Sequence, residues 1–382
     1  MVPQLVALDL VGPSFVDALR RVWDRGDAAL PLDPRLPQPA VDRLLEAMAP
    51  ASIIDRGGGE RDLGGSRSVE VGDALVMATS GSTGDPKGVV LTHDALAAHA
   101  HGVHARLGVD RDRDRWLACL PLAHMGGLGV VVRALVDDVP LDVLAGFDAA
   151  TVAAAPADLG STLTSLVPAT LDRLPADHGF RWVVLGGSGD LVERPANVVH
   201  TYGLTETGGG IWYSPGGLLE GAELRIVDGE IEVGGPTLLR SYRDGTDPRG
   251  PDGWLPTGDL GEWTPAGELV VHGRRGDLII TGGENVWPTV VEQALLTHPK
   301  VAEVAVVGDL DLNWGRRVVA YVVPPPGVLS PSLDELRDWV KEALPAYAAP
   351  RGLRIVTQLP RTALGKVRRD ELRQKPTLRL RR

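Results

Sequence analysis

Cysteine is almost absent from this chain of 382 residues, which contains only Cys119. A single cysteine cannot form an intramolecular disulfide framework, and no Cys/His spacing resembles a structural zinc site. Cys119 lies in the apolar run Trp116–Leu120, so we expect it to be an unreactive core residue. The composition, with 43% hydrophobic and 23% charged residues, is typical of a soluble intracellular globular protein.

Long apolar runs and an excess of basic charge are missing as well. No basic segment followed by an uninterrupted apolar stretch opens the chain, so we expect no secretory signal. The longest apolar region, Gly126–Leu135, contains Arg133 and is too short to span a bilayer. The net charge of −11 argues against bulk binding of nucleic acid. We therefore expect a cytoplasmic protein that neither inserts into membranes nor binds nucleic acid.

Glycine and hydroxyl side chains are concentrated in the segment 79–89, which reads TSGSTGDPKGV. The segment lies between two β-like apolar runs, Ala74–Ala78 and Val89–Leu91. Glycine lets the backbone approach an anion closely, and hydroxyl groups and a lysine add donors and positive charge. The pattern predicts a phosphate-binding loop made by these residues: Thr79, Ser80, Gly81, Ser82, Thr83, Gly84 and Lys87.

Two other interpretations of this segment are weaker. Gly/Ser clusters are often only flexible loops, so the segment by itself is not decisive. A P-loop NTPase is excluded, because its lysine follows a glycine and precedes Ser or Thr, whereas Lys87 follows Pro86 and precedes Gly88. The segment also continues into a second strand-like run instead of a helix. It therefore indicates a phosphate loop of another design.

The pattern of apolar residues predicts an α/β fold. The first 70 residues show short helical patterns between Pro- and Gly-rich breaks, and from 74 to about 205 strand-like and helical runs alternate. The expected strands are Ala74–Ala78, Trp116–Leu120, Thr162–Val167, Trp182–Leu185 and Val198–Thr201. The expected helices are Asp94–Leu107, Gly127–Val136 and Pro168–Leu174.

The pattern changes after residue 222. Two hairpins are expected. In the first, Ala222–Val227 and Glu230–Val233 flank the turn Asp228-Gly229, and in the second, Asp259–Trp263 and Glu268–His272 flank a Pro-Ala-Gly turn. A small α+β unit follows Gly276, and Ser332 with Glu335 forms a capping box at the start of a helix. We therefore expect a large N-terminal α/β domain with a β-rich subdomain, residues 1–275, and a small α+β domain, residues 276–382.

Five further motifs follow the phosphate loop. They are Tyr202–Thr207 (YGLTET), Trp254–Asp259 (WLPTGD, a carboxylate in a turn), Gly273-Arg274, Gly282–Asn285 (GGEN) and Gly365-Lys366. In this order the six motifs resemble those of the adenylate-forming superfamily, which comprises acyl-CoA synthetases, luciferases and peptide-synthetase adenylation domains. The resemblance covers roughly residues 70 to 373, and six ordered motifs are far more specific than any one of them.

The resemblance implies a reaction in two steps. A carboxylic acid is joined to ATP with release of pyrophosphate, and a thiol, commonly that of coenzyme A, then displaces AMP from the acyl adenylate. The first step brings a carboxylate onto an anionic triphosphate, so cations and oriented donors must neutralise the charge that develops. The implied cofactors and substrates are ATP, Mg²⁺, coenzyme A and a small carboxylic acid.

The resemblance also implies a role for each matched position. Glu206 would hold Mg²⁺, Thr205 would contact the α-phosphate, and Lys366 would bridge the attacking carboxylate and the nucleotide. The base and ribose would be bound by the following residues: Gly186, Gly187, Ser188, Tyr202, Gly203, Asp259 and Arg274. The small C-terminal domain would be mobile about a hinge at Gly276, and Gly282 and Gly283 would line the thiol tunnel.

Taken singly, three of these residues have simpler interpretations. Asp259 could be an Asx-turn residue, Glu206 could cap a helix, and Lys366 could be solvated. Their joint order favours the functional interpretation.

Among CoA ligases, the runs Leu120–Leu128 and Gly273–Asn285 are most similar to those of the o-succinylbenzoate–CoA ligases of menaquinone biosynthesis. That substrate carries a second carboxylate, which needs a donor or a cation in the acid pocket. His124 and Ser214 are assigned to the acid pocket. For the second carboxylate itself, Ser214 and Arg133 are weaker candidates, and Arg133 is not assigned to the site. His124 could equally be a structural residue.

Three alternatives stay open. The region before the phosphate loop is short and no carrier-protein segment follows Lys366, which favours a stand-alone CoA ligase, and a homodimer is compatible with it. The chain could instead be another acyl or aryl ligase, including one that loads a carrier protein. A non-catalytic nucleotide-binding protein is the third alternative, which the presence of both Lys366 and Glu206 disfavours.

Overall fold

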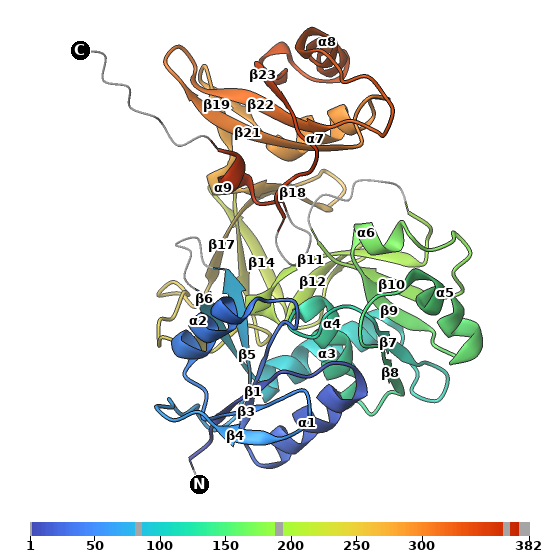
Figure 1. Ribbon diagram of the computed structural model, residues 1–382, viewed down its shortest axis with the longest axis vertical. Helices are drawn as coiled ribbons and strands as arrows, with labels where there is room; N and C mark the ends of the chain where they lie inside the picture. Colours follow the sequence, from blue (N-terminus) through green and yellow to red (C-terminus); the bar gives the residue numbers. More distant parts are fainter. Residues whose placement is uncertain (1, 81–85, 188–193, 362–366, 374–382) are drawn as a thin grey trace. The chain divides into compact units, whose positions relative to one another are not determined.

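The computed structural model describes residues 2–80, 86–187, 194–361 and 367–373 (Figure 1). The contacts within the chain form two compact units. Unit 1 comprises Met1–Arg225 and Glu232–Pro256, and unit 2 comprises Ile226–Ile231 and Thr257–Arg382. The two-domain division expected at Gly276 stays a prediction. Among the described residues, no helix is both long and apolar enough to cross a membrane.

The first sheet of unit 1 has seven strands in the order β16-β6-β5-β2-β1-β3-β4. Its centre is parallel, because β1 pairs with β2 and β3, and β2 with β5, in parallel register. β6 returns antiparallel to β5 across the predicted phosphate loop. The strands are β1 (Leu5–Leu8), β2 (Ala28–Pro31), β3 (Ser52–Ile54), β4 (Glu60–Asp62), β5 (Asp73–Ser80), β6 (Pro86–Thr92) and β16 (Ser241–Tyr242).

The helical interpretation of the first 70 residues is incomplete, since β1, β2 and β3 also come from this region. These strands are only three or four residues long and are buried along their whole length. A short strand that is buried on both faces lacks the polar–apolar alternation that marks a strand in sequence. The α/β alternation therefore begins at residue 5 and not at residue 74.

The second sheet of unit 1 also has seven strands, in the order β13-β12-β11-β10-β9-β7-β8. β8, β7, β9, β10 and β11 are parallel, and β12 and β13 are antiparallel additions at one edge. The four strands expected after residue 100 are confirmed. The observed bounds are β7 (Trp116–Ala118), β8 (Leu141–Val143), β9 (Leu163–Leu166), β10 (Trp182–Leu185), β11 (Val198–Leu204), β12 (Gly209–Ser214) and β13 (Gly217–Leu218).

Helices pack between and around these sheets. α1 contacts β1, β2 and β8, so it touches both sheets. α3 contacts β6 of the first sheet, and its His99 is hydrogen-bonded to Gly210 of the second. The α/β layer architecture expected from the sequence is thus confirmed (Figure 1). The helices are α1 (Gly12–Asp24), α2 (Gln38–Met48), α3 (His93–Leu107), α4 (Met125–Val136), α5 (Ala149–Asp158) and α6 (Pro168–Leu171).

A third sheet has four strands in the order β14-β15-β17-β18. The boundaries between unit 1 and unit 2 fall within its strands β14, β15 and β17. Both expected hairpins are confirmed. Asp228 and Gly229 have φ of 49° and 78°, as a two-residue turn of the primed type requires, and Gly267 has φ of 80° in the second turn. The strands are β14 (Glu223–Val227), β15 (Glu230–Gly234), β17 (Leu255–Trp263) and β18 (Leu269–Arg274).

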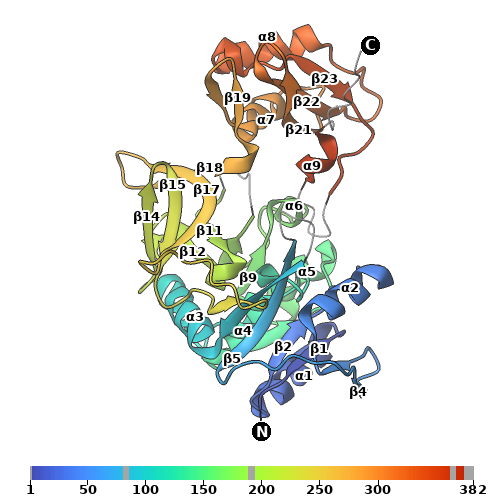
Figure 2. The same cartoon turned by 90° about the vertical axis from the view of Figure 1, so that its left-hand side faces the viewer.

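The C-terminal part of unit 2 has the expected α+β structure, a five-stranded sheet with helices packed on it (Figure 2). The sheet buries both faces: alternate residues of β21 and β22 pack on α7 and α8, and the others pack on residues such as Leu359 and Leu372. Ser332 Oγ accepts a hydrogen bond from the N–H of Glu335, which confirms the capping box. The elements are β19 (Ile279–Thr281), β20 (Glu284–Val286), α7 (Pro288–Leu296), β21 (Glu303–Asp311), β22 (Gly315–Val323), α8 (Leu333–Ala343), β23 (Gly352–Ile355) and α9 (Arg369–Leu372).

Gly127 gives a test of how closely α4 packs. A Cβ atom at this position would lie 2.4 Å from the carbonyl oxygen of Leu120 and 2.6 Å from that of Pro121. We expect Gly127→Ala to lower the free energy of unfolding by about 1–3 kcal/mol, because the backbone must move to admit a methyl group. Urea denaturation followed by circular dichroism measures this change.

Gly126→Ala is the matched control, since a Cβ there meets only the Leu120 side chain, at 3.4 Å. Alanine is the better helix former, so this variant should be at least as stable as the wild type. Equal stability of the two variants would contradict the packing argument.

Candidate functional site

Glu206 lies in a short 3-10 turn, Thr205–Thr207, that joins β11 to β12. The buried Thr207 holds this turn: its Oγ1 accepts from the N–H of Leu204 at 2.9 Å and donates to the Gly209 carbonyl at 2.7 Å. Gly208 ends the turn with φ of 67°. The turn therefore presents Thr205 and Glu206 at the carboxyl end of a parallel strand, where α/β folds bind ligands.

Gly203 is required where the chain reverses direction between β11 and the antiparallel β12. The pairing of β11 and β12 shifts register between Tyr202 and Gly203. A Cβ atom on Gly203 would lie 2.0 Å from the Gly209 carbonyl oxygen. The backbone geometry alone explains this glycine, whatever its role toward a nucleotide.

The carboxylate of Glu206 is half-buried and is held on one side. Its Oε1 accepts a hydrogen bond from the hydroxyl of Tyr242 at 3.0 Å. Within the part of the chain that the structure describes, no donor reaches Oε2. The side chain therefore keeps one hard oxygen for a ligand such as Mg²⁺. Glu206 makes no capping bond in this turn.

Lys87 lies near Glu206. Its Nζ is 4.9 Å from the centre of the Tyr242 ring, so the same tyrosine contacts both side chains. Lys87 pairs with Thr79 in the register of β5 and β6, and Ser80 ends β5. Other expected site residues lie outside the described residues: Gly81, Ser82, Thr83, Gly84, Ser188 and Lys366.

The expected base-binding residues come from adjacent parallel strands. Leu185 of β10 is level with His200 of β11, so Gly186 and Gly187 follow β10 beside the position of Tyr202. Gly187 has φ of 113°, which side chains rarely allow. The structure therefore places Gly186, Gly187 and Tyr202, which were predicted to bind the base, next to one another.

Asp259 and Arg274 belong to unit 2. The sequence predicts Asp259 both in a turn and as the first residue of the second hairpin. The structure confirms the hairpin and places Asp259 within β17, where its backbone pairs with that of Arg274 in β18. Asp259 is buried and its Oδ1 lies 2.9 Å from Nε of Arg274, whose side chain is 55% exposed. A buried carboxylate beside an accessible guanidinium offers both acceptors and donors to a ribose.

The three glycines expected at the hinge and thiol tunnel also lie in unit 2. Gly282 and Gly283 form the turn between β19 and β20, with φ of 61° and 89°. A Cβ on Gly282 would meet the Trp314 ring at 2.7 Å. Gly276 has no positive φ and open space around its Cα, so the local structure does not require glycine there.

His124 is the N-cap residue of α4 and is tied to a carboxylate that the sequence analysis did not identify. Its Nε2 lies 3.2 Å from Oδ2 of Asp33, which is buried and also bound by Arg35. Burial alone would raise the pKa of the Asp33 carboxyl, but hydrogen bonds from Arg35 lower it to about 2. Asp33 therefore stays ionised and orients the imidazole. Ser214, the other expected acid-pocket residue, ends β12.

Arg133 is a buried cation on α4. It is 4% exposed, donates to Ser165 Oγ at 2.9 Å, and its guanidinium lies 4.6 Å from the centre of the Trp116 ring. No acidic side chain among the described residues pairs with it, and its Nε has no partner there. Burial lowers the pKa of this guanidinium. The signal in the sequence is a single charge inside the apolar run 126–135.

A second unpartnered polar group lies near this arginine. The hydroxyl of Tyr213 is fully buried and finds no hydrogen-bond partner in the described part of the chain. Burial raises the pKa of Tyr213 to about 12, and the charge of Arg133 opposes this rise. Tyr213 immediately precedes Ser214 on β12. Among the described residues, the Arg133 cation thus lacks an acidic partner and the Tyr213 hydroxyl lacks a hydrogen-bond partner, and both are suited to an anionic ligand group.

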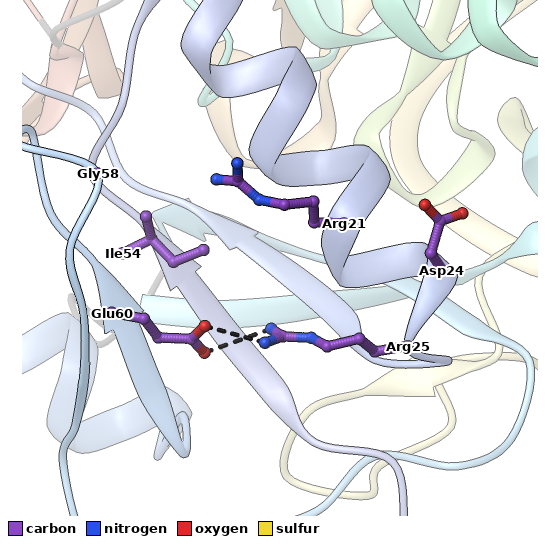
Figure 3. A pocket seen from close by; sticks show the side chains of 6 residues that line it. All are labelled: Arg21, Asp24, Arg25, Ile54, Gly58 and Glu60. Carbon is purple, nitrogen blue, oxygen red and sulfur yellow. Dashed lines mark hydrogen bonds and ion pairs between the residues drawn. The ribbon is translucent and has the colours of Figure 1, made fainter.

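A separate hollow of about 400 Å³ on unit 1 contains none of the expected site residues (Figure 3). Arg25 and Glu60 close one side of it through two hydrogen bonds of 2.9 and 3.3 Å. Its two arginines and two acidic residues give the lining no net charge. The lining consists of Arg21, Asp24, Arg25, Ile54, Gly58 and Glu60.

Comparison with known proteins agrees with this arrangement. Residues 66–243 match the family of AMP-binding enzymes, and residues 290–366 match the AMP-binding enzyme C-terminal domain. The chain is 40% identical over 361 residues to a probable 2-succinylbenzoate–CoA ligase of Mycobacterium tuberculosis, covering 87% of this chain and 93% of that relative. This chain belongs to the AMP-binding enzyme family.

Two further relatives of this AMP-binding enzyme are informative. It is 37% identical to the 2-succinylbenzoate–CoA ligase of Bacillus cereus, over 78% of this chain and 69% of the relative. Its structure is similar, with a TM-score of 0.85 and 29% identity, to o-succinylbenzoate CoA synthetase (MenE) from Bacillus subtilis in complex with the acyl-adenylate intermediate OSB-AMP. That match covers 98% of this chain and 88% of the other. The adenylate-forming superfamily predicted from the motifs is confirmed.

His99 gives a pH test of the turn that carries Glu206. It is buried against Gly208 and Gly209 and donates from Nε2 to the Gly210 carbonyl at 3.0 Å. Burial lowers the pKa of His99 from 6.5 to about 3. Between these values the unfolded chain binds a proton that the folded chain does not, so the free energy of unfolding should fall by up to about 1.4 kcal/mol per pH unit as pH drops below 6.5.

Urea denaturation between pH 7.5 and 4.5 measures this slope. His99→Gln keeps an N–H donor but cannot titrate, so its stability should depend less steeply on pH than that of the wild type. His101→Gln, at a histidine whose side chain is 63% exposed, is the control and should keep the wild-type slope. Identical slopes for all three proteins would contradict the role given to His99.

Proposed function

We propose that this chain is an AMP-forming acid–thiol ligase that converts 2-succinylbenzoate to its CoA thioester in menaquinone biosynthesis. The relatives named 2-succinylbenzoate–CoA ligase support this substrate, and one of them matches over 93% of its length. The observation in the chain itself that carries the proposal is Arg133, a buried cation without a carboxylate partner among the described residues. A substrate with a second carboxylate supplies that partner.

In the adenylation step, one carboxylate oxygen of the acid attacks the α-phosphorus of ATP and pyrophosphate leaves. Lys87 and the phosphate loop would bind the β- and γ-phosphates, and Thr205 would donate to the α-phosphate. Glu206 would hold Mg²⁺ through Oε2, and the ion, when bound, neutralises charge on the phosphate oxygens. Lys366 would neutralise the charge shared by the acid and the α-phosphate in the transition state.

In the second step, the thiol sulfur of coenzyme A attacks the acyl carbon and AMP leaves. Asp259 and Arg274 would hold the ribose through both steps, Gly186, Gly187, Ser188, Tyr202 and Gly203 would bind the base, and Gly282 and Gly283 would admit the pantetheine arm. A rotation at Gly276 would withdraw Lys366 between the steps. His124 and Ser214 would line the acid pocket.

Arg133 would bind the second carboxylate of the substrate. The guanidinium already donates to Ser165 and lies over the Trp116 ring, and the hydroxyl of Tyr213 is a further buried donor. A charge-assisted hydrogen bond in such a site contributes about 1.5–3 kcal/mol. It would therefore select a dicarboxylic substrate over an otherwise identical monocarboxylic one by roughly 10- to 150-fold.

ATP–pyrophosphate exchange with a panel of acids tests this proposal. We expect exchange with 2-succinylbenzoate, and at least tenfold weaker exchange with 3-benzoylpropionate, which lacks the ring carboxylate. Arg133→Gln should remove this preference by raising KM for the dicarboxylate alone, and Arg133→Lys should retain part of it. Exposed Arg111→Gln is the control. Equal use of both acids by the wild type, or exchange with other acids only, would overturn the substrate assignment.

Lys366→Ala tests the division between the two steps. We expect a loss of about 10²–10³ in the rate of adenylate formation, because one electrostatic contact to the transition state is removed. Thioester formation from supplied acyl adenylate and coenzyme A should continue at nearly the wild-type rate. Lys341→Ala, which alters a surface pair with Asp338, serves as the control. Equal loss in both steps would remove the role given to Lys366.

A homodimer and a cytoplasmic location stay predictions from the sequence. Sedimentation velocity of the purified chain tests the first, and fractionation of expressing cells tests the second.

A further inference from the structure

Tyr242 contacts two side chains that the proposed function assigns to MgATP. Its hydroxyl donates to Oε1 of Glu206 at 3.0 Å, and its ring faces Nζ of Lys87 at 4.9 Å. An ammonium group at this distance from an aromatic ring is attracted to the face of the ring. One side chain therefore touches both the expected metal ligand and the expected phosphate cation.

The backbone around Tyr242 links the elements that carry these two residues. The N–H of Leu239 donates to the carbonyl oxygen of Glu206 at 2.7 Å. In β16, Tyr242 is then level with Val89 of β6, two residues from Lys87. The N–H of Arg243 donates to the Gly88 carbonyl at 2.6 Å. The segment 239–243 thus connects the Glu206 turn to the strand that begins next to Lys87.

Two arginines hold this segment in place. Arg240 binds both carboxylate oxygens of the buried Asp73, at 2.8 and 2.9 Å. Arg243 is 8% exposed and donates to the carbonyl oxygens of Met48 at 3.0 Å and Ser68 at 2.7 Å. Because anchored residues lie on both sides of it, Tyr242 has little freedom to follow Glu206 or Lys87 if either moves.

The geometry points to Tyr242 as a positioning residue for MgATP, orienting the carboxylate of Glu206 toward the metal and the ammonium group of Lys87 toward the phosphates. This inference rests on the proposed function. The hydroxyl occupies Oε1, so Oε2 is the oxygen left to bind a cation. The ring limits Lys87 to one side, which reduces the side-chain entropy lost when the ammonium group binds an anion.

Two substitutions separate the hydroxyl contact of Tyr242 with Glu206 from its ring contact with Lys87. Tyr242→Phe removes the hydroxyl and keeps the ring, whereas Tyr242→Leu removes both. Binding of α,β-methylene-ATP to the full chain is measured by calorimetry without divalent metal, and Mn²⁺ binding in the presence of this nucleotide is measured by electron paramagnetic resonance. No acid is added, so the result does not depend on which acid is the substrate.

For Tyr242→Phe we expect Mn²⁺ affinity to fall about tenfold while metal-free nucleotide binding is unchanged, because the hydrogen bond to the charged Glu206 side chain is lost. Tyr242→Leu should show the same loss and also bind metal-free nucleotide about threefold more weakly. Glu206→Gln should lower Mn²⁺ affinity, and adding Tyr242→Phe to it should cause no further loss. Tyr347→Phe is the control for a tyrosine outside the site.

A merely structural role would give a different result. If Tyr242→Phe lowers metal-free and metal-dependent binding equally, or lowers neither, the inference is wrong. Additive losses in the double variant would overturn it as well. If the wild type binds the nucleotide and Mn²⁺ as expected but exchanges no pyrophosphate with 2-succinylbenzoate, only the proposed substrate fails. If the wild type binds no nucleotide, the proposed function and this inference fail together.

Discussion

The reversal of chain direction between β11 and β12 is the constraint on which the rest of the site depends. The two strands approach so closely that a side chain at Gly203 would overlap the Gly209 backbone, and Thr207 closes the intervening turn with its hydroxyl. Glu206 is presented by this turn. A carboxylate on a rigid turn can bind a cation without first losing conformational freedom.

The same reversal determines what lies beneath the turn. His99 fills the space under Gly208 and Gly209 as a neutral ring, because burial holds its pKa at about 3. Arg133 lies near enough to contribute to this shift, and it has no acidic partner among the described residues. Unit 1 therefore holds an uncompensated positive charge in a chain whose net charge is −11. For an enzyme whose substrates are anions, local cations of this kind supply the attraction that the overall charge does not.

Several elements could be predicted because their signals are local. Asp228-Gly229 specifies a tight hairpin, and Ser332 with Glu335 specifies a helix start, since each acts on backbone groups within a few residues. The strands β1, β2 and β3 could not be distinguished, because a short buried strand has no alternation to detect. The strand expected from Asp259 to Trp263 is confirmed by its pairing with β18, but β17 begins earlier, at Leu255, which the sequence does not indicate because Pro256 and Gly258 give this stretch the composition of a turn.

The sequence by itself determined the chemistry that this protein can carry: six ordered motifs, an α/β fold and the residue types suited to a nucleotide and a metal ion. Only the tertiary structure decided which side chains contact the candidate residues of the site. Tyr242 lies 36 residues beyond Glu206 and Asp33 lies 91 residues before His124, so neither pair shares a local pattern. Contacts between distant segments arise when sheets and helices pack, and it is packing that assigns Tyr242 to Glu206 and leaves Arg133 buried without an acidic partner among the described residues.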